Sequence, residues 1–432
     1  MYRFFERAVA VVALLANMDV FVRLVSPEIM ISEKDPRMSS TDLKPGLIMV
    51  QALIYLLLIV VIAPRLSRVL GAMGKIRLLT ALYALSVASI LWSIDPMLTF
   101  RRDILLCAWL VVGVYLGERY SMDEFLDLLG WAFGIVITLS VALYFIHPSY
   151  VLDPSHAPAW RGLCLHKNSF GACMTLGALV FATCARRTRP FVNYSFCAAS
   201  MLMIFLSHSA TALLLGLVIL ISTPLWRLAK LPKAQLVPIG IIAAIVIARL
   251  AIWISGPPLD FLNALGRDAT LTGRTHLWAP VMVAISRRPL LGYGYDVFWQ
   301  GLKGESLQAA ISAGWLAPSS HNGYLELALG LGIPALVLFA FIYISLITSA
   351  LRYSRRTPGA TARWPIAFAI FVAVQNAVES TLLGRNAIDC LLLVVIFTAL
   401  KLEEYRNARR EPTWAMNVVL PEERATLHPE LA

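Results

Sequence analysis

The most suggestive pair of reactive side chains in this sequence is a histidine followed by an asparagine. His321 and Asn322 end a long segment rich in proline, glycine, tryptophan and histidine, and an apolar run begins directly after them. A neutral imidazole can take a proton from an alcohol, and neighbouring arginines would favour the neutral form. We therefore predict that His321 is a general base, oriented by Asn322 or Glu326. The structural alternative is a histidine that only bonds the backbone at a helix start.

Clusters of basic side chains indicate that an anion is bound nearby. Arg161 and Lys167 belong to the run from Arg161 to Asn168, Arg274 lies between Gly273 and Trp278, and Arg288 precedes Pro289. A guanidinium fork matches phosphate oxygens, and an ammonium adds a point charge, so both can hold an anionic leaving group. We predict that His321 and Arg274 act in catalysis and that the substrate is bound by Arg161, Lys167, Asn168, Asn322 and Arg288. For Arg274 and Arg288 the alternative is contact with lipid headgroups.

Metal-binding patterns are absent from the segments that carry these clusters. They contain no Asp-x-Asp and no His-Glu-x-x-His sequence, and the six cysteines form no Cys-x-x-Cys pair. Most cysteines fall inside apolar runs, where they resemble small hydrophobic residues. We therefore predict a reaction that needs neither a metal ion nor another cofactor.

The elements that position these residues are membrane helices. Of the 432 residues, 59% are hydrophobic and only 15% are charged, a composition foreign to soluble domains. Apolar runs of about 17 to 25 residues recur, each long enough to cross roughly 30 Å of hydrocarbon as a helix. We predict an all-α polytopic membrane protein with about twelve transmembrane helices. They lie near residues 8–25, 46–63, 77–92, 104–117, 127–146, 170–185, 191–206, 210–226, 236–254, 322–348, 364–382 and 387–401.

The distribution of basic residues predicts the orientation of this bundle. With a cytoplasmic N-terminus, most of the 37 lysines and arginines fall in short cytoplasmic loops, as the positive-inside rule requires. The net charge of +11 is thereby explained without nucleic acid. The long segments 147–169 and 255–321, the second between spans nine and ten, then lie outside and carry all the reactive clusters. We predict one membrane domain over 1–405, a polar cytoplasmic tail over 406–432, and both termini in the cytoplasm of a bacterium.

Four short motifs together resemble the O-antigen ligase and polysaccharide polymerase superfamily over roughly residues 85 to 400. They are Leu91 to Pro96, Gly273 to Trp278, Pro289 to Gly294, and the His-Asn start of a span that carries Gly330. The run from Arg161 to Asn168 is most similar to the exopolysaccharide polymerase branch. The resemblance implies a glycosyltransferase of the inner membrane. It would act at the periplasmic face on a glycan linked to undecaprenyl pyrophosphate.

The resemblance leaves the acceptor open. The favoured activity is polymerisation of lipid-linked repeat units of an exopolysaccharide or O-antigen, and the alternative is transfer of the finished glycan to lipid A core. Implied partners are the lipid-linked donor, an acceptor glycan or lipid A core, and membrane lipids, with a chain-length regulator or export complex as a further class. A flippase of lipid-linked oligosaccharide would need repeats or charged broken helices, which the sequence does not display. A non-catalytic scaffold would tolerate loss of His321 and Arg274.

Overall fold

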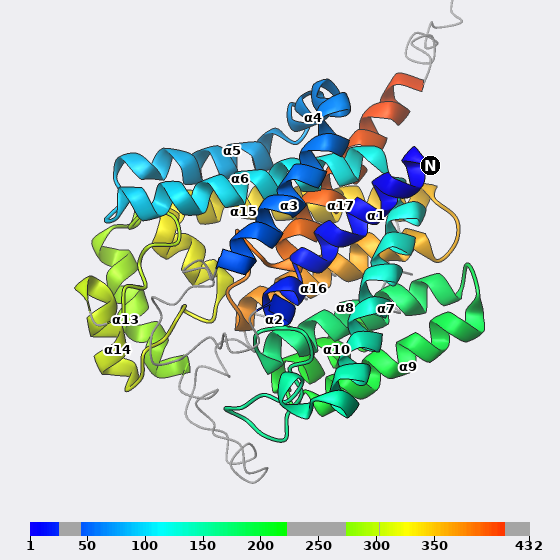
Figure 1. The fold of residues 1–432 in the computed structure, drawn as a ribbon. Coiled ribbons are helices and arrows are strands. Elements are labelled where there is room, and N and C mark those ends of the chain that lie inside the picture. The colour runs from blue at the N-terminus through cyan, green and yellow to red at the C-terminus, as the bar shows by residue number, and fades with distance from the viewer. Residues whose placement is uncertain (26–44, 223–273, 302, 411–432) are drawn as a thin grey trace, which may run out of the picture.

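The computed structural model describes residues 1–25, 45–222, 274–301 and 303–410, and these ranges are helical (Figure 1). Apart from helices and turns they contain one isolated β-bridge, between Leu152 and Trp160. The prediction of an all-α fold is thus confirmed. The helices are α1 (Tyr2–Ala16), α2 (Val20–Val25), α3 (Pro45–Ile62), α4 (Leu66–Met73), α5 (Arg77–Ala88), α6 (Pro96–Arg119), α7 (Met122–Ile146), α8 (Lys167–Ala185), α9 (Pro190–Leu206), α10 (Ala210–Ser222), α13 (Arg274–Arg287), α14 (Gly304–Ala313), α15 (Gly323–Arg356), α16 (Trp364–Val378) and α17 (Ile388–Arg410).

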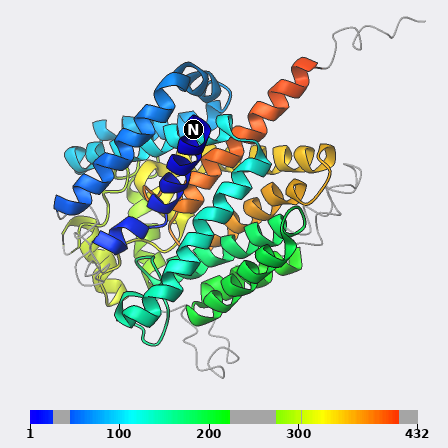
Figure 2. The same cartoon turned by 45° about the vertical axis from the view of Figure 1, so that its right-hand side comes forward.

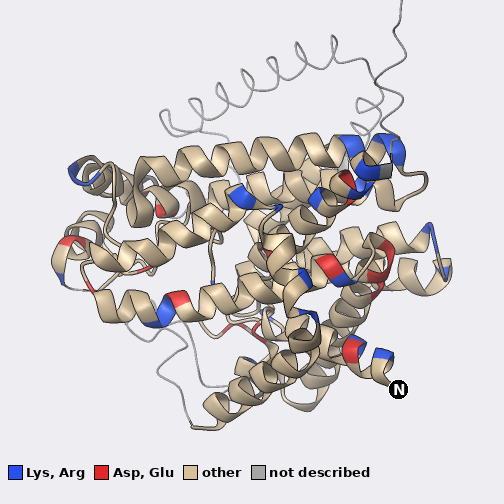
Figure 3. Cartoon of the chain, turned by 90° about the horizontal axis from the view of Figure 1, so that it is seen from above, with Lys and Arg blue, Asp and Glu red and all other residues tan. Residues whose placement is uncertain are grey.

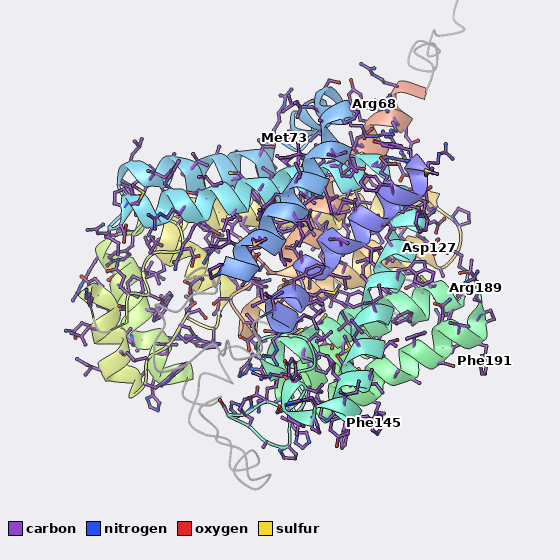
Figure 4. The ribbon with its side chains drawn as sticks, in the orientation of Figure 1. Arg68, Met73, Asp127, Phe145, Arg189 and Phe191 are labelled. Atoms are coloured by element: carbon purple, nitrogen blue, oxygen red, sulfur yellow. The ribbon has the colours of Figure 1, made fainter. Side chains whose placement is uncertain are left out.

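Several of these helices have the length and composition of membrane spans. The segments Pro45–Met73, Met122–Ile146, Lys167–Ala185 and Gly323–Arg356 are long and apolar enough to cross a bilayer, and three shorter helices are also apolar. Predicted spans within the described residues coincide with helices in whole or in part, whereas the one near 236–254 lies outside them. Large apolar side chains such as Phe145 and Phe191 are exposed at the periphery of the bundle (Figure 4). Such surfaces suit lipid rather than water, and the chain is a multi-pass membrane protein.

The two ends of the bundle differ in charge and in structure. The N-terminus, Arg68 and Arg189 lie toward one end (Figures 1 and 4), and Figure 3 shows a group of basic residues there. Helices α13 and α14 and the connection that follows α7 lie away from that end (Figure 1). The segments that carry the reactive clusters therefore occupy the part of the molecule remote from the basic end.

Helices α6 and α17 pack closely at the centre of the bundle (Figure 2). A Cβ atom added at Gly113 would lie 2.7 Å from Cγ1 of Val394, and one added at Gly117 would lie 2.5 Å from the Val395 carbonyl oxygen. Small residues allow such close approach, which is how helices associate where no water drives them together. This packing holds the start of α6 near the loop that precedes α17.

Helix α15 is broken a few turns after its start. Gly332 has φ +81°, outside the helical region, and Pro334 follows it. The carbonyl oxygens of Leu329 and Gly330 accept hydrogen bonds from the N–H groups of Tyr293 (3.0 Å) and Gly294 (2.9 Å). The break is therefore filled by another part of the chain, as backbone at membrane depth requires.

Two of the sequence motifs meet at this break. Segment 289–294 runs against α15, and Leu91 to Pro96 runs against segment 289–294, because Ile94 N–H donates to the Tyr293 carbonyl at 3.0 Å. A Cβ atom at Gly294 would lie 2.4 Å from Oγ of Ser93, so only glycine fits between the segments. Both motifs therefore have a structural role in the described fold. Segment 289–294 leads directly into Tyr295 and Asp296, and Leu91 to Pro96 packs against it.

Candidate active site

The backbone at His321 has an unusual conformation. Its φ is +49°, in the left-handed region that residues other than glycine seldom adopt and that is enriched at functional sites. The neighbouring Ser320 is fixed on both sides: its N–H donates to Glu326 at 2.8 Å, and its carbonyl accepts from the indole N–H of Trp278 at 2.9 Å. The surroundings therefore hold the imidazole in one place.

Neither residue expected to orient His321 contacts its ring in the structure. Asn322 is the N-cap of α15, and its Oδ1 accepts the N–H groups of Tyr324 (3.0 Å) and Leu325 (3.1 Å). Glu326 accepts the Ser320 N–H described above and the indole N–H of Trp299 at 2.7 Å. Asn322 and Glu326 thus support the segment rather than the imidazole.

The group that contacts the imidazole is Glu379, which follows α16. Nδ1 of His321 lies 3.0 Å from Oε2 of Glu379, and Nδ2 of Asn168 donates to Oε1 of the same carboxylate at 3.1 Å. A carboxylate only accepts, so Nδ1 carries the hydrogen and Nε2 keeps its lone pair. This His321–Glu379 dyad has the arrangement of a general base whose carboxylate partner sets the tautomer.

An indole lies beside the dyad. The ring centroids of Trp315 and His321 are 5.7 Å apart, with an angle of 39° between the planes. Both side chains are half-buried, so part of each remains accessible. An exposed indole face next to a base offers a platform for an apolar sugar face.

A cavity of about 410 Å³ lies next to the residues that flank the dyad, although neither His321 nor Glu379 is among its lining residues. Ser319 and Ser380, which are close neighbours of His321 and Glu379 in the sequence, both line it. Its walls come from the turn between α1 and α2, α6, α8, segment 295–299, the first turns of α15 and the loop 380–389. The volume is within the range of small-molecule sites.

Two arginines and one aspartate form a charged cluster in the cavity wall, which also holds the acidic residues Asp19, Glu326 and Asp389. Asp296 lies between Arg102 and Arg385: one carboxylate oxygen is 2.9 Å from Nη2 of Arg385, and the other is 3.6 Å from Nη1 of Arg102. Arg102 also bonds the Asp296 carbonyl oxygen. Within this cluster two guanidinium groups share one carboxylate. Guanidinium groups placed in this way can also hydrogen-bond the oxygens of a bound phosphate.

Arg161 and Lys167 lie in a different place. Arg161 is buried in the connection between α7 and α8, and burial lowers its pKa while the nearby Asp153 opposes that shift. The N–H of Lys167 donates to Asp153 at 3.2 Å as α8 begins. Neither side chain lines the cavity. The residues of the run from Arg161 to Asn168 therefore contact two different groups. Arg161 and Lys167 lie beside Asp153, and Asn168 lies at the dyad.

The remaining predicted arginines belong to α13 and its end. Arg288 is exposed, and its guanidinium lies 4.8 Å from the ring centroid of Tyr293. Arg274 is the first residue of α13, and its side chain lies outside the described residues. Of the residues predicted from the sequence, the structure thus gathers His321, Asn322 and Asn168. Arg161 and Arg288 instead interact with Asp153 and Tyr293.

Arg102, Asp296, Glu379 and Arg385 were not among the predicted site residues. The one signal available for Arg102 was its place in the basic pair Arg101-Arg102, directly before the predicted span 104–117. Asp296 and Arg385 offered no such signal, since both follow ordinary loop residues. Their proximity arises only from the packing of α6, α15 and α17.

Comparison with known proteins agrees with the motifs. The family model for O-antigen ligase matches residues 195–340, which include His321 and the break in α15. The chain is also 26% identical over 357 residues to the exopolysaccharide production protein ExoQ of Rhizobium meliloti (strain 1021), covering 79% of this chain and 80% of that protein. Both matches confirm the resemblance inferred from the motifs, and the chain is similar to O-antigen ligases and to a polysaccharide production protein of this kind.

Proposed function

We propose that this protein polymerises polyprenyl-pyrophosphate-linked oligosaccharide repeat units of an exopolysaccharide or O-antigen. The observation that carries the proposal is the His321–Glu379 dyad beside a cavity whose wall holds Arg102 and Arg385. A glycosyl transfer with a diphosphate leaving group requires a base and cationic hydrogen-bond donors, and the dyad and the two arginines supply these. The O-antigen ligase match and the name of the relative from Rhizobium meliloti support a role in polysaccharide assembly.

The reaction follows from the charges of the reacting groups. Nε2 of His321 takes the proton of the acceptor hydroxyl, and the hydroxyl oxygen attacks the anomeric carbon of the donor at the same time. The bond from that carbon to the pyrophosphate oxygen breaks, and its electron pair leaves with the diphosphate. Glu379 stabilises the imidazolium that forms, which later releases its proton to water. Arg102 and Arg385 stabilise the negative charge of the leaving diphosphate. Because this group leaves as an anion, no general acid has to protonate it.

We propose that this transfer is independent of metal ions, since guanidinium groups supply the positive charge. Arg274 remains a proposed catalytic residue, because its helix α13 lies against α15 and Trp278 of the same helix bonds the His321 segment. Arg161, Lys167 and Arg288 remain proposed substrate contacts farther along the glycan or the lipid. Asn168 and Asn322 act by holding Glu379 and the start of α15.

We further propose that the site faces the periplasm from the bacterial inner membrane, with both termini in the cytoplasm. The basic end of the bundle carries the N-terminus, Arg68 and Arg189, and the positive-inside rule assigns such an end to the cytoplasm. The site, remote from that end, then opens outward. An undecaprenyl tail would lie among the apolar spans while the pyrophosphate reaches the cavity.

The test uses the full chain, purified and placed in lipid, with polyprenyl-pyrophosphate repeat units and added EDTA. Lengthened lipid-linked product is expected from the wild type and not from His321→Ala. The matched control is His208→Asn, which alters an exposed histidine away from the dyad and keeps a residue that tolerates the positive φ there. Transfer only to lipid A core would establish a ligase, and translocation without any new glycosidic bond would establish a flippase. Loss of the wild-type reaction with EDTA at an unchanged melting temperature would refute the metal-independent mechanism.

A further inference from the structure

The connection between α7 and α8 contains three side chains that the proposed reaction does not use. Asp153, His156 and His166 each offer one oxygen or nitrogen atom, and these atoms all lie within 4.8 Å of one another. The Asp153 side chain is 4% exposed and that of His156 is 36% exposed. The group is therefore enclosed on one side and open to solvent on the other.

The local fold brings these three residues together from separate positions. A β-bridge joins Leu152 to Trp160, and Asp153 N–H donates to the Ala159 carbonyl at 2.8 Å, which closes the loop that carries His156. His166 arrives as the N-cap of α8. The spacing of these three residues matches no short metal-binding sequence pattern, so the group is visible only in the folded chain.

We propose that Asp153, His156 and His166 bind one divalent transition metal ion of the zinc class. Each residue supplies one ligand, a carboxylate oxygen or a ring nitrogen, and water completes the coordination from the exposed side. Two imidazoles and one carboxylate are ligands that zinc and its neighbours prefer. Calcium and magnesium are disfavoured, because they take oxygen ligands and this group offers a single carboxylate beside the cation Arg161.

The contacts now present are compatible with such an ion. Nδ1 of His156 lies 3.4 Å from Asp153, and Nδ1 of His166 accepts the Asn168 N–H at 3.2 Å, both at the long end of hydrogen-bond lengths. A metal bond to each ring nitrogen would replace these weak contacts. The N–H groups of Ser155 (3.0 Å) and Lys167 (3.2 Å) would stay on the carboxylate, which has lone pairs enough for both roles.

The ion would join the loop around residues 153–159 to the first turn of α8. Asn168, in that turn, donates to the Glu379 carboxylate. The metal would thus stabilise the support of the dyad without entering the reaction. Because binding is measured directly, this inference stands or falls separately from the glycosyl transfer.

The experiment measures metal binding to the full chain purified in detergent. The protein is stripped with EDTA, dialysed and titrated with Zn²⁺, and bound metal is counted by mass spectrometry. Co²⁺ is added in parallel, because its visible absorption reports nitrogen and oxygen coordination. One ion per chain is expected, together with a higher melting temperature.

The variants decide where the ion binds. His156→Ala and Asp153→Asn are expected to lose the ion, whereas His147→Ala should keep it, since His147 lies in the same connection but contacts Ser149. Melting curves without metal check that each variant is folded. If Asp153→Asn fails to fold, His156→Ala decides the question, because His156 is the most exposed ligand. Absence of stoichiometric binding by the wild type would overturn the proposal. So would binding that folded His156→Ala retains at unchanged affinity.

Discussion

Replacing Glu379 by glutamine is the sharpest perturbation of the dyad. The carboxylate accepts from two donors at once, His321 and Asn168. Glutamine has one accepting oxygen and one donating nitrogen, so it can accept from only one of them. The Asn168 amide can turn to present its oxygen, and the histidine then keeps a neutral hydrogen bond in place of a charge-assisted one.

The size of the effect follows from that exchange. A hydrogen bond to a charged group contributes about 1.5–3 kcal/mol and a neutral one about 1 kcal/mol, so the imidazolium loses roughly 0.5–2 kcal/mol of stabilisation. At about 1.4 kcal/mol per factor of ten, kcat should fall roughly 2- to 30-fold. Glu379→Leu removes the acceptor altogether and should cost more, because Nδ1 is then left without its partner.

The assay is the rate of glycan lengthening at saturating donor, with protein amount and melting temperature measured beside it. Glu305→Gln is the matched control, since Glu305 forms a surface pair with Arg287 on α13 and α14. The exchanged pair Asn168→Asp with Glu379→Gln restores a negative charge next to the histidine and should recover part of the rate. A folded Glu379→Gln protein with wild-type kcat would refute the assignment of Glu379 as the orienting carboxylate.

Three further outcomes are expected. Arg385→Lys keeps the charge but loses the planar guanidinium that bonds Asp296. The loss of about 1.5 kcal/mol in a charge-assisted hydrogen bond should lower kcat/KM roughly tenfold, measured from initial rates at low donor concentration. Trp315→Ala should raise the acceptor KM more than it lowers kcat, by roughly 2- to 12-fold for about 0.5–1.5 kcal/mol of stacking, and Trp315→Phe should recover most of it. Gly332→Ala places a Cβ 2.3 Å from a backbone oxygen at φ +81°, so the melting temperature should fall, whereas Gly71→Ala, with no atom within 4 Å, should not lower it.

The helices were predictable from the sequence because the bilayer imposes them. An apolar run such as that of α3 or α7 has one stable form in lipid, and hydropathy alone locates it. The position of His321 and Asn322 at the start of a helix was also predictable, since asparagine is a preferred N-cap before an apolar run. His321 as base and Arg274 as catalyst stay predictions until the variants are measured.

The partners of His321 were beyond the reach of sequence patterns. Glu379 lies 58 positions after the histidine, on the far side of two helices, and no spacing rule connects them. Asn322 and Glu326, the residues predicted to orient His321, lie within a few positions of it in the sequence. Both residues make other hydrogen bonds: Asn322 caps α15, and Glu326 accepts from Ser320 and Trp299. Contacts of this kind depend on helix packing, which local sequence does not encode.

The dyad lies where two helices meet end to end, and this placement has a physical cause. Helix termini leave backbone groups without partners, and in a membrane the protein itself must satisfy them. Here the Gly323 N–H donates to the Glu379 carbonyl at 3.1 Å, and the Asn322 N–H donates to Oγ of Ser380 at 3.0 Å. The bonds that close the start of α15 and the end of α16 are therefore the same bonds that hold His321 against Glu379. Damage to Ser380 should accordingly lower stability and rate together, whereas a change confined to the Glu379 carboxylate should lower the rate alone.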